Sequence, residues 1–525
     1  MKTRFTILII ILVILISLPV IIFLKSKGFS VTLIHPYDSI YVFSDFPVSL
    51  AALPYDSFEE IEIFVNDKSI EKIDVDKIST IIIGNVRLIN LPVKISQFQS
   101  GNYNIKFVFK RDFLSLDKSV ELYISYYKLT PNPVKANLND IEKVNDFLSK
   151  EAPEFTDYLR RAREFLKDWK NNKEYLTEKE KIRKADIPEV IKESFLDLVN
   201  NIEIDTVILK INNSANYFNY VLYENGYPFF INVLDIWKKK SSLRCLTLYY
   251  RITDTIIIGN NIEKEKVYLL ERIDNIKRKE LFIGILQENS PFTVILNEIN
   301  DKISRQFKNI ISDDLSIASK QIREFTRYYI KDDSETKIIK DEITKEFNEF
   351  RITHNDISEN LYKQIMLMNS ALHEGKHLID YKNGFPYSKC IAEILPAFFG
   401  ENIKDTKILS ISDIQDILYI ITDINPEFSA YLYSLAYSQA CRKFTLLELL
   451  SFITNKNTQN TEYDWAAKLI LTKLAEKNGI DTHNLLLQQS LNNEREWSEI
   501  FKKLIVLPAD KIKDDSKNIL IEQFN

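Results

Sequence analysis

The residues most able to do chemistry lie in the stretch His373-Glu374-Gly375-Lys376-His377. Two histidines four residues apart on a helix face the same side, so both imidazoles can bind one Zn²⁺. Glu374 would lie beside that ion, where it can take a proton from a zinc-bound water whose pKa the metal lowers to about 7. The spacing therefore predicts a zinc site with His373 and His377 as ligands and Glu374 as general base.

A catalytic zinc needs a third protein ligand and an open position for water. Two later glutamates are candidates: Glu393, which has apolar neighbours that suggest burial, and Glu427, which follows Asn425 and Pro426. We expect Asn425 to cap a helix and Pro426 to take its first position. Glu427 would then lie in a first helical turn, where the helix dipole favours a carboxylate. We prefer Glu427 as the third ligand and keep Glu393 as the alternative.

Asp380 follows the two histidines on the same predicted helical face. A carboxylate at this place can orient a metal-bound imidazole by accepting a hydrogen bond from its other nitrogen. The alternative is that Asp380 is an ordinary residue of the last helical turn with no role at the site.

The helix that must carry these residues is indicated by apolar side chains at three- and four-residue spacing before His373. Ser358 is a plausible N-cap, and Asn383-Gly384 is a plausible C-terminal end. Helical periodicity continues through most of residues 297–525, which we expect to form a mainly helical domain.

Residues 29–130 read as short alternating strands separated by turns, which predicts an Ig-like β-sandwich. We expect this sandwich to act as a spacer. Residues 131–296 read as a mixed α/β region, with strands expected at 206–209 and 220–223 among others. The predicted fold class is thus a multidomain α+β protein.

Residues 5–24 are an almost unbroken apolar run, long enough to span a bilayer. The run passes directly into Lys25-Ser26-Lys27 without the small-residue cleavage site of a signal peptide. We therefore expect residues 1–28 to be a short cytoplasmic tail and an uncleaved, single-pass membrane anchor. The rest of the chain would lie outside the cytoplasm, attached to the cell membrane.

The charge balance argues against a dedicated nucleic-acid binder, because 69 Lys and Arg face 74 Asp and Glu, a net charge of −5. Hydrophobic residues at 45% and charged residues at 27% indicate a globular chain rather than a disordered one. The sequence leaves the oligomeric state open.

The region from His354 to Ile453 carries a family resemblance. The HExxH motif with Asp380, the later helix Glu427–Ala436 and the Leu-rich helix Phe444–Phe452 resemble bacterial membrane-anchored or secreted proteins of the gluzincin type of zinc metallopeptidase. The resemblance implies His373, His377 and Glu427 as zinc ligands and Glu374 as general base. Lys376 departs from the pattern, because most zinc peptidases have an uncharged residue there.

These features lead to the expectation of a membrane-anchored, extracytoplasmic zinc-dependent hydrolase that acts on peptides or proteins. The alternative is a non-catalytic cell-surface binding or scaffold protein on a degenerate zincin fold.

Overall fold

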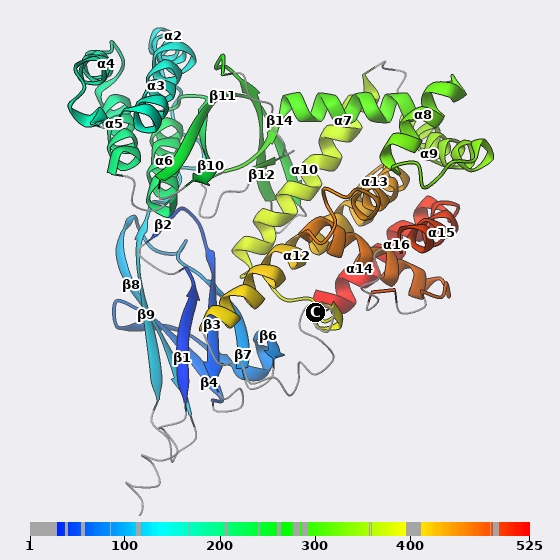
Figure 1. The fold of residues 1–525 in the computed structure, drawn as a ribbon. Helices are drawn as coiled ribbons and strands as arrows, with labels where there is room; N and C mark the ends of the chain where they lie inside the picture. Colours follow the sequence, from blue (N-terminus) through cyan, green and yellow to red (C-terminus); the bar gives the residue numbers. More distant parts are fainter. Residues whose placement is uncertain are drawn as a thin grey trace, which may run out of the picture.

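The structure is a computed structural model of the chain. It describes residues 29–524 apart from 37–39, 54–57, 84–85, 112–116, 167, 205–207, 240–241, 260–263, 277–283, 286–291, 356–357, 359, 395–410, 483–484 and 487–492. The described part is a mixed fold of helices and three β-sheets. Figure 1 shows two sheets at the lower left, helices α2 to α6 above them, and the C-terminal helices on the right.

Two sheets near the N-terminus enclose one core between them. The first sheet has the order β1-β3-β7-β6, with β1 Ser30–His35, β3 Phe46–Leu53, β7 Val86–Val93 and β6 Ser79–Ile83. The second has the order β2-β9-β8-β4-β5, with β2 Ile40–Val42, β9 Lys118–Tyr126, β8 Gly101–Lys110, β4 Glu60–Val65 and β5 Lys68–Asp74. Leu50 of β3, Leu91 of β7 and Phe107 of β8 share this core, which therefore lies between the facing sheets.

The first sheet is covered on both faces. Leu50 and Leu91 face the second sheet, whereas Ala51 and Leu88, which point the other way along the same strands, belong to the core of the C-terminal helices. This explains why β3 reads as a nearly continuous apolar run, FPVSLAAL, instead of alternating. The two sheets therefore differ from the spacer expected from the sequence, because they pack directly on the helical part of the chain.

A group of helices follows the two sheets, with its own apolar core. Phe195 of α5 and Phe218 of α6 are fully buried there. The helices are α2 Leu138–Asp146, which continues through a π-helical turn at Phe147–Glu151 into α3 Ala152–Phe165, then α4 Lys173–Arg183, α5 Glu189–Ile204 and α6 Ile208–Glu224.

Helix α6 replaces the strands predicted at 206–209 and 220–223, in so far as the structure describes them. The buried residues Ile211, Ala215, Phe218 and Leu222 recur at three- and four-residue spacing, which is the helical period. The prediction was wrong because the aromatic and β-branched content of the segment was given more weight than this period.

The third sheet has the order β10-β11-β12-β14-β13, in which β12 and β14 are parallel. Helices α3 and α6 pack on β11 and β10, and Asn219 of α6 bonds to the backbone of Ile231 in β10 with both groups of its amide. The strands are β10 Phe229–Lys239, β11 Ser242–Gly259, β12 Lys264–Arg272, β13 Gly284–Ile285 and β14 Thr293–Leu296.

The described part of residues 297–524 is helical and surrounds the largest apolar core of the chain. In Figure 1, α10 runs between the third sheet and the other C-terminal helices, with α12 beside it. The helices are α7 Asn297–Ile310, α8 Leu315–Phe325, α9 Asp333–Thr353, α10 Leu361–Lys382, α12 Ile411–Tyr437, α13 Arg442–Thr454, α14 Glu462–Lys477, α15 Glu494–Ile505 and α16 Ala509–Phe524.

The predicted fold class also needs a correction at the N-terminus. Residues 5–24, to which the sequence assigns a membrane-spanning helix, lie outside the described residues. Among the helices that the structure does describe, none combines the length and apolar character needed to cross a bilayer. The fold of the described residues is therefore one of mixed helices and sheets, without a membrane-spanning helix among them.

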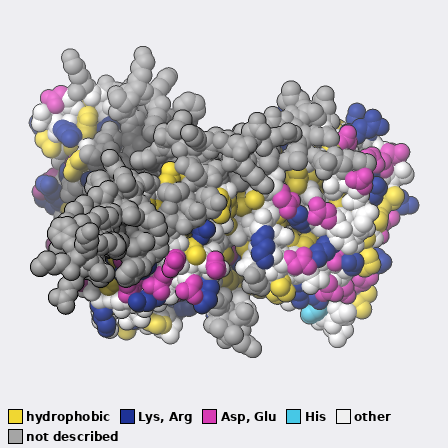
Figure 2. All heavy atoms as spheres, turned by 90° about the horizontal axis from the view of Figure 1, so that it is seen from below, with side chains coloured by type: hydrophobic (Ala, Val, Ile, Leu, Met, Phe, Trp, Pro, Cys, Tyr) yellow, Lys and Arg dark blue, Asp and Glu magenta, His cyan; other side chains and the backbone are white. Residues whose placement is uncertain are grey.

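The surface seen in Figure 2 carries basic and acidic side chains interspersed on its coloured part. Neighbouring side chains of opposite charge form ion pairs, such as Lys477 with Glu522 and Lys502 with Glu335. The pattern agrees with the small net charge of the chain.

Candidate metal centre

Helix α10 carries the HExxH residues and is fixed on the third sheet. Gly375, inside the motif, lies against Ile258 of β11 and Val267 of β12. Ala371 and Ile379, each one turn away from Gly375, belong to the same apolar cluster. The helix backbone can approach the sheet this closely because Gly375 has no side chain, and the sheet therefore sets the position of both histidines.

Helix α12 carries Glu427 and lies beside α10. It runs continuously from Ile411 to Tyr437 with Pro426 inside it, so the predicted helix start at Asn425 and Pro426 is wrong. The Asn425 side chain instead accepts a hydrogen bond from Ser388 N and donates one to Pro386 O. Phe428, which directly follows Glu427, is fully buried. Side-chain contacts on both sides of Glu427 therefore hold this segment in place.

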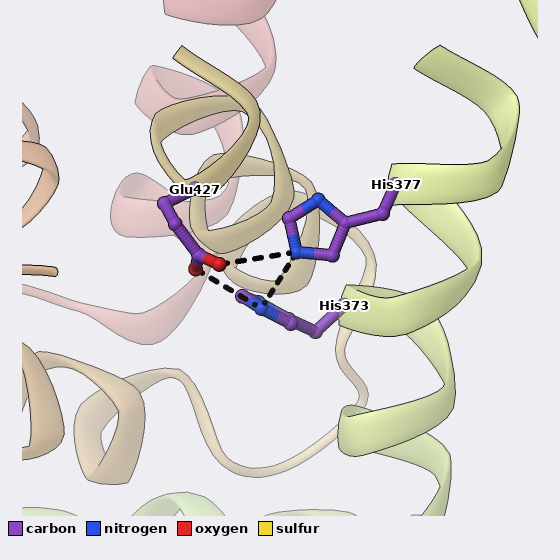
Figure 3. Close-up of side chains that lie close together, drawn as sticks. All are labelled: His373, His377 and Glu427. Carbon is purple, nitrogen blue, oxygen red and sulfur yellow. Dashed lines mark hydrogen bonds and ion pairs between the residues drawn. The ribbon is translucent and has the colours of Figure 1, made fainter. Parts of the chain in front are cut away.

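The side chains of His373, His377 and Glu427 converge between the two helices (Figure 3). The Nε2 atoms of the two histidines lie 3.2 Å apart. His373 Nε2 lies 3.3 Å from Glu427 Oε2, and His377 Nε2 lies 3.5 Å from Glu427 Oε1. Each residue thus offers one donor atom to a common point, and the group could hold a metal ion.

The electrostatics of this group fit a cation site. Burial opposes the charge on Glu427, but the two imidazoles outweigh it and hold the pKa of this carboxyl well below its usual range. Burial lowers the pKa of His377, but Glu427 and further carboxylates around it raise that pKa to about 9. Glu427 Oε2 is buried and accepts no well-aligned hydrogen bond from the described residues. An ion held between the three side chains would add positive charge beside this carboxylate.

Glu374 is buried at 8% exposure, directly beside this group in sequence. Burial raises the pKa of its carboxyl, the two histidines lower it, and Glu427 raises it again. A carboxyl with a raised pKa is a better proton acceptor than an ordinary surface glutamate. The structure thus brings together His373, His377, Glu427 and Glu374 from the sequence prediction.

Asp380 has a different partner from the one expected. Its Oδ1 lies 2.5 Å from Lys376 Nζ, in an ion pair across one helical turn. Its Oδ2 is buried without a hydrogen bond to the described residues. Asp380 still helps to raise the pKa of His377 by its charge, so its effect on the site is electrostatic. This pair also explains how α10 accommodates Lys376 within the motif.

Glu393 lies outside the group of possible ligands. Its side chain is 46% exposed and pairs with Lys473 of α14 through both carboxylate oxygens at 2.9 Å. The apolar neighbours Ile391 and Ile394 are buried, but Glu393 itself points to solvent. Burial of the neighbours therefore says little about the residue between them.

Two further residues lie close to His373. The ring of Tyr431, one turn after Glu427, lies on His373 with 4.3 Å between ring centroids; its place one turn after a predicted ligand is the sequence signal that points to it. Glu448 of α13 is close enough to interact electrostatically with His373, and burial raises its pKa to about 7. The sequence signal for Glu448 is that it is the one acidic residue in the apolar run Leu446-Leu447-Glu448-Leu449-Leu450.

Comparison of this chain with protein families, curated proteins and solved structures finds no match.

Proposed function

We propose that this chain is a zinc-dependent hydrolase that cleaves peptide bonds. The observation that carries the proposal is the convergence of three side chains. The two histidine Nε2 atoms lie 3.2 Å apart, and the Glu427 carboxylate lies 3.3 Å from His373 Nε2 through Oε2 and 3.5 Å from His377 Nε2 through Oε1. Ligand atoms on a tetrahedral zinc with bonds of about 2.0–2.1 Å lie roughly 3.3–3.4 Å apart. The donor set of two imidazoles and one carboxylate is also that of many catalytic zinc sites, with a fourth position left for water.

The chain's own residues would divide the work as follows. His373 and His377 from α10 and Glu427 from α12 hold the ion, and the charge of Glu427 offsets part of the charge of the dication. A zinc ion held in this way lowers the pKa of a water in its open position. Glu374 takes the proton from the attacking water and passes it to the leaving amine. Burial of Glu374 supports this role because it makes the carboxyl a stronger base.

Two measurements on the purified protein test the proposal. Elemental analysis should find zinc in a one-to-one ratio to the chain, and a mixed peptide library should be hydrolysed. Glu374→Gln should keep the zinc but lose a factor on the order of 10²–10⁴ in rate, the usual worth of a positioned base.

Glu393→Gln is the matched control, since Glu393 is exposed and paired with Lys473. This variant should keep both zinc and hydrolysis. Absence of zinc from the wild-type protein would refute the proposal, and so would full hydrolysis by the Glu374→Gln variant. Zinc without any hydrolysis would favour the binding-protein alternative.

A further inference from the structure

Lys376 lies inside the HExxH motif, and the fold encloses most of its side chain. That side chain is only 15% exposed, and its Nζ lies 2.5 Å from Oδ1 of the buried Asp380. Burial of an ammonium group is unfavourable unless an opposite charge or aromatic ring faces replace the lost water. The surroundings of Lys376 must therefore stabilise a cation.

Two aromatic rings from other helices complete these surroundings. The Nζ atom of Lys376 lies over the ring of Tyr433 in α12, 5.8 Å from its centroid, and over the ring of Phe524 in α16, 6.0 Å from its centroid. The face of an aromatic ring attracts a cation at this range. Since α12 packs against both α10 and α16, the ammonium group lies where these three helices meet.

Phe524 also lies beside the other half of the metal centre. Its ring centroid is 6.0 Å from that of Phe428, which is fully buried and directly follows Glu427. Lys376 directly precedes His377. The ring of Phe524 is thus close to the chain neighbour of one candidate ligand on α10 and of the candidate ligand on α12.

Hydrogen bonds fix the end of α16 on the segment that follows α10. The main-chain oxygen of Gln523 accepts a hydrogen bond from Lys389 N at 3.1 Å. Its side-chain Oε1 accepts one from Cys390 N at 2.7 Å. These two bonds hold Phe524 in place without help from Lys376.

We propose that Lys376 is a positioning residue of the metal centre. Its ammonium group, paired with Asp380 and facing the rings of Tyr433 and Phe524, keeps α12 against α10 where Glu427 meets the two histidines. The inference rests on the metal site of the proposed function. In this role Lys376 touches neither ion nor substrate, and it acts through the helices that carry the ligands.

Zinc affinity, measured by competition with a chelator, tests this role in two variants. Lys376→Met keeps the length of the side chain but removes its charge. It should bind zinc about tenfold more weakly than the wild-type protein, at the lower end of the loss that follows removal of groups supporting metal ligands. Lys376→Arg keeps a cation that a carboxylate and aromatic faces also attract, so it should retain most of the affinity.

Lys468→Met is the matched control. Lys468 is 19% exposed, pairs across one helical turn with the buried Asp464 at 2.9 Å, and lies 5.0 Å from the ring centroid of Trp465. Both of these partners belong to its own helix, α14, which carries none of the three donor side chains. This variant should bind zinc as the wild-type protein does. An equal loss of zinc affinity in Lys468→Met and Lys376→Met would overturn the inference, because general destabilisation would then explain both.

A second readout separates positioning from a merely structural role. The visible absorption of bound Co²⁺ depends on the number and arrangement of its ligands. It should change in Lys376→Met and in Phe524→Leu, and stay unchanged in Lys468→Met. In the Phe524→Leu background, Lys376→Met should weaken zinc binding less than in the wild-type protein, because the cation has already lost one ring. Strictly additive losses of affinity would contradict this coupling.

Unchanged zinc affinity and Co²⁺ absorption in Lys376→Met would overturn the inference. If this variant fails to fold, Phe524→Leu still decides, since an unaltered Co²⁺ absorption there would overturn the inference equally. These results differ from failure of the proposed function. A wild-type protein that binds zinc but hydrolyses no peptide would refute the hydrolase, while the comparison of metal binding would still decide the role of Lys376. A wild-type protein that binds neither metal would refute both.

Discussion

Gly375 and Ile258 approach each other so closely that a Cβ atom on Gly375 would lie 1.9 Å from Ile258 Cδ1 and 2.5 Å from its Cγ1. Gly375 stands between the general-base candidate Glu374 and Lys376, in the middle of the motif. The glycine is needed here for space and not for an unusual backbone angle, because it lies inside a regular helix. The third sheet therefore contacts the metal-site helix at the turn that carries both histidines.

Gly375→Ala should lower the free energy of unfolding by up to about 2 kcal/mol. Overpacking a buried site typically destabilises the folded state by about 1–3 kcal/mol. Replacing Gly by Ala inside a helix stabilises it by about 1 kcal/mol. Urea unfolding of the two proteins measures the difference.

The control for this prediction is the double variant Gly375→Ala with Ile258→Ala. Removing the Ile258 side chain creates the space that the new methyl group needs. In the Ile258→Ala background, Gly375→Ala should therefore be neutral or stabilising by up to about 1 kcal/mol, the helix-propensity gain. If Gly375→Ala costs the same in both backgrounds, Ile258 is not the obstacle.

Glu427→Gln should weaken zinc binding strongly, whereas Glu393→Gln should leave it unchanged. An amide oxygen is a poorer ligand for a dication than a carboxylate, and it leaves the site with less negative charge. Glu393 is a surface residue paired with Lys473. Zinc content after dialysis against a chelator measures both effects. Retention of zinc by Glu427→Gln with loss from Glu393→Gln would reverse the assignment of the third ligand.

Expressed alone, residues 29–130 should show the circular dichroism of a β protein but associate in a concentration-dependent way. The first sheet would then expose the face that packs on the C-terminal helices, including Ala51 and Leu88. An exposed apolar patch of this kind promotes association. Sedimentation measures the state of the fragment.

Two leucines of β7 provide a matched pair for this test, since each is 1% exposed in the full chain. In the fragment, Leu88→Lys should restore a monomer, because Leu88 faces outward from the two sheets. Leu91→Lys should unfold the fragment, because Leu91 lies between the sheets. A monomeric wild-type fragment, or a folded Leu91→Lys fragment, would contradict this account of the packing.

Features that depend on local sequence were predictable, and features that depend on packing were not. The helix over 361–382 follows from apolar spacing and from the turn at Asn383-Gly384, where Gly384 has a φ of 82°. Its two histidines share a face for the same local reason. Strand β8 lies within residues 29–130, which read as alternating strands, for an equally local reason, because its buried residues alternate with partly buried ones.

The choice of Glu427 over Glu393 depends on how α12 packs against α10, which no spacing along the chain reveals. The path of the chain through Pro426 shows the same limit. Proline at this position suggests a helix start, yet α12 continues through it because contacts of Asn425 and Phe428 hold the segment. The electrostatic proximity of Glu448 to His373 likewise arises from the packing of α13 near α10.

Zinc should raise the melting temperature of the wild-type protein but not that of His377→Ala. A ligand that binds only the folded state stabilises it by RT ln(1 + [L]/Kd), which is about 2.7 kcal/mol at a concentration of 100 Kd. His373, His377 and Glu427 lie on two helices that meet only in the folded chain. The unfolded state should therefore bind zinc weakly. Removing His377 leaves two donors, which hold the ion far less tightly than three.

A thermal scan with zinc, and again after addition of a chelator, measures the effect. The chelator should return the wild-type protein to its metal-free melting temperature and leave His377→Ala unaffected. An equal zinc response in both proteins would show that the ion binds somewhere other than this group.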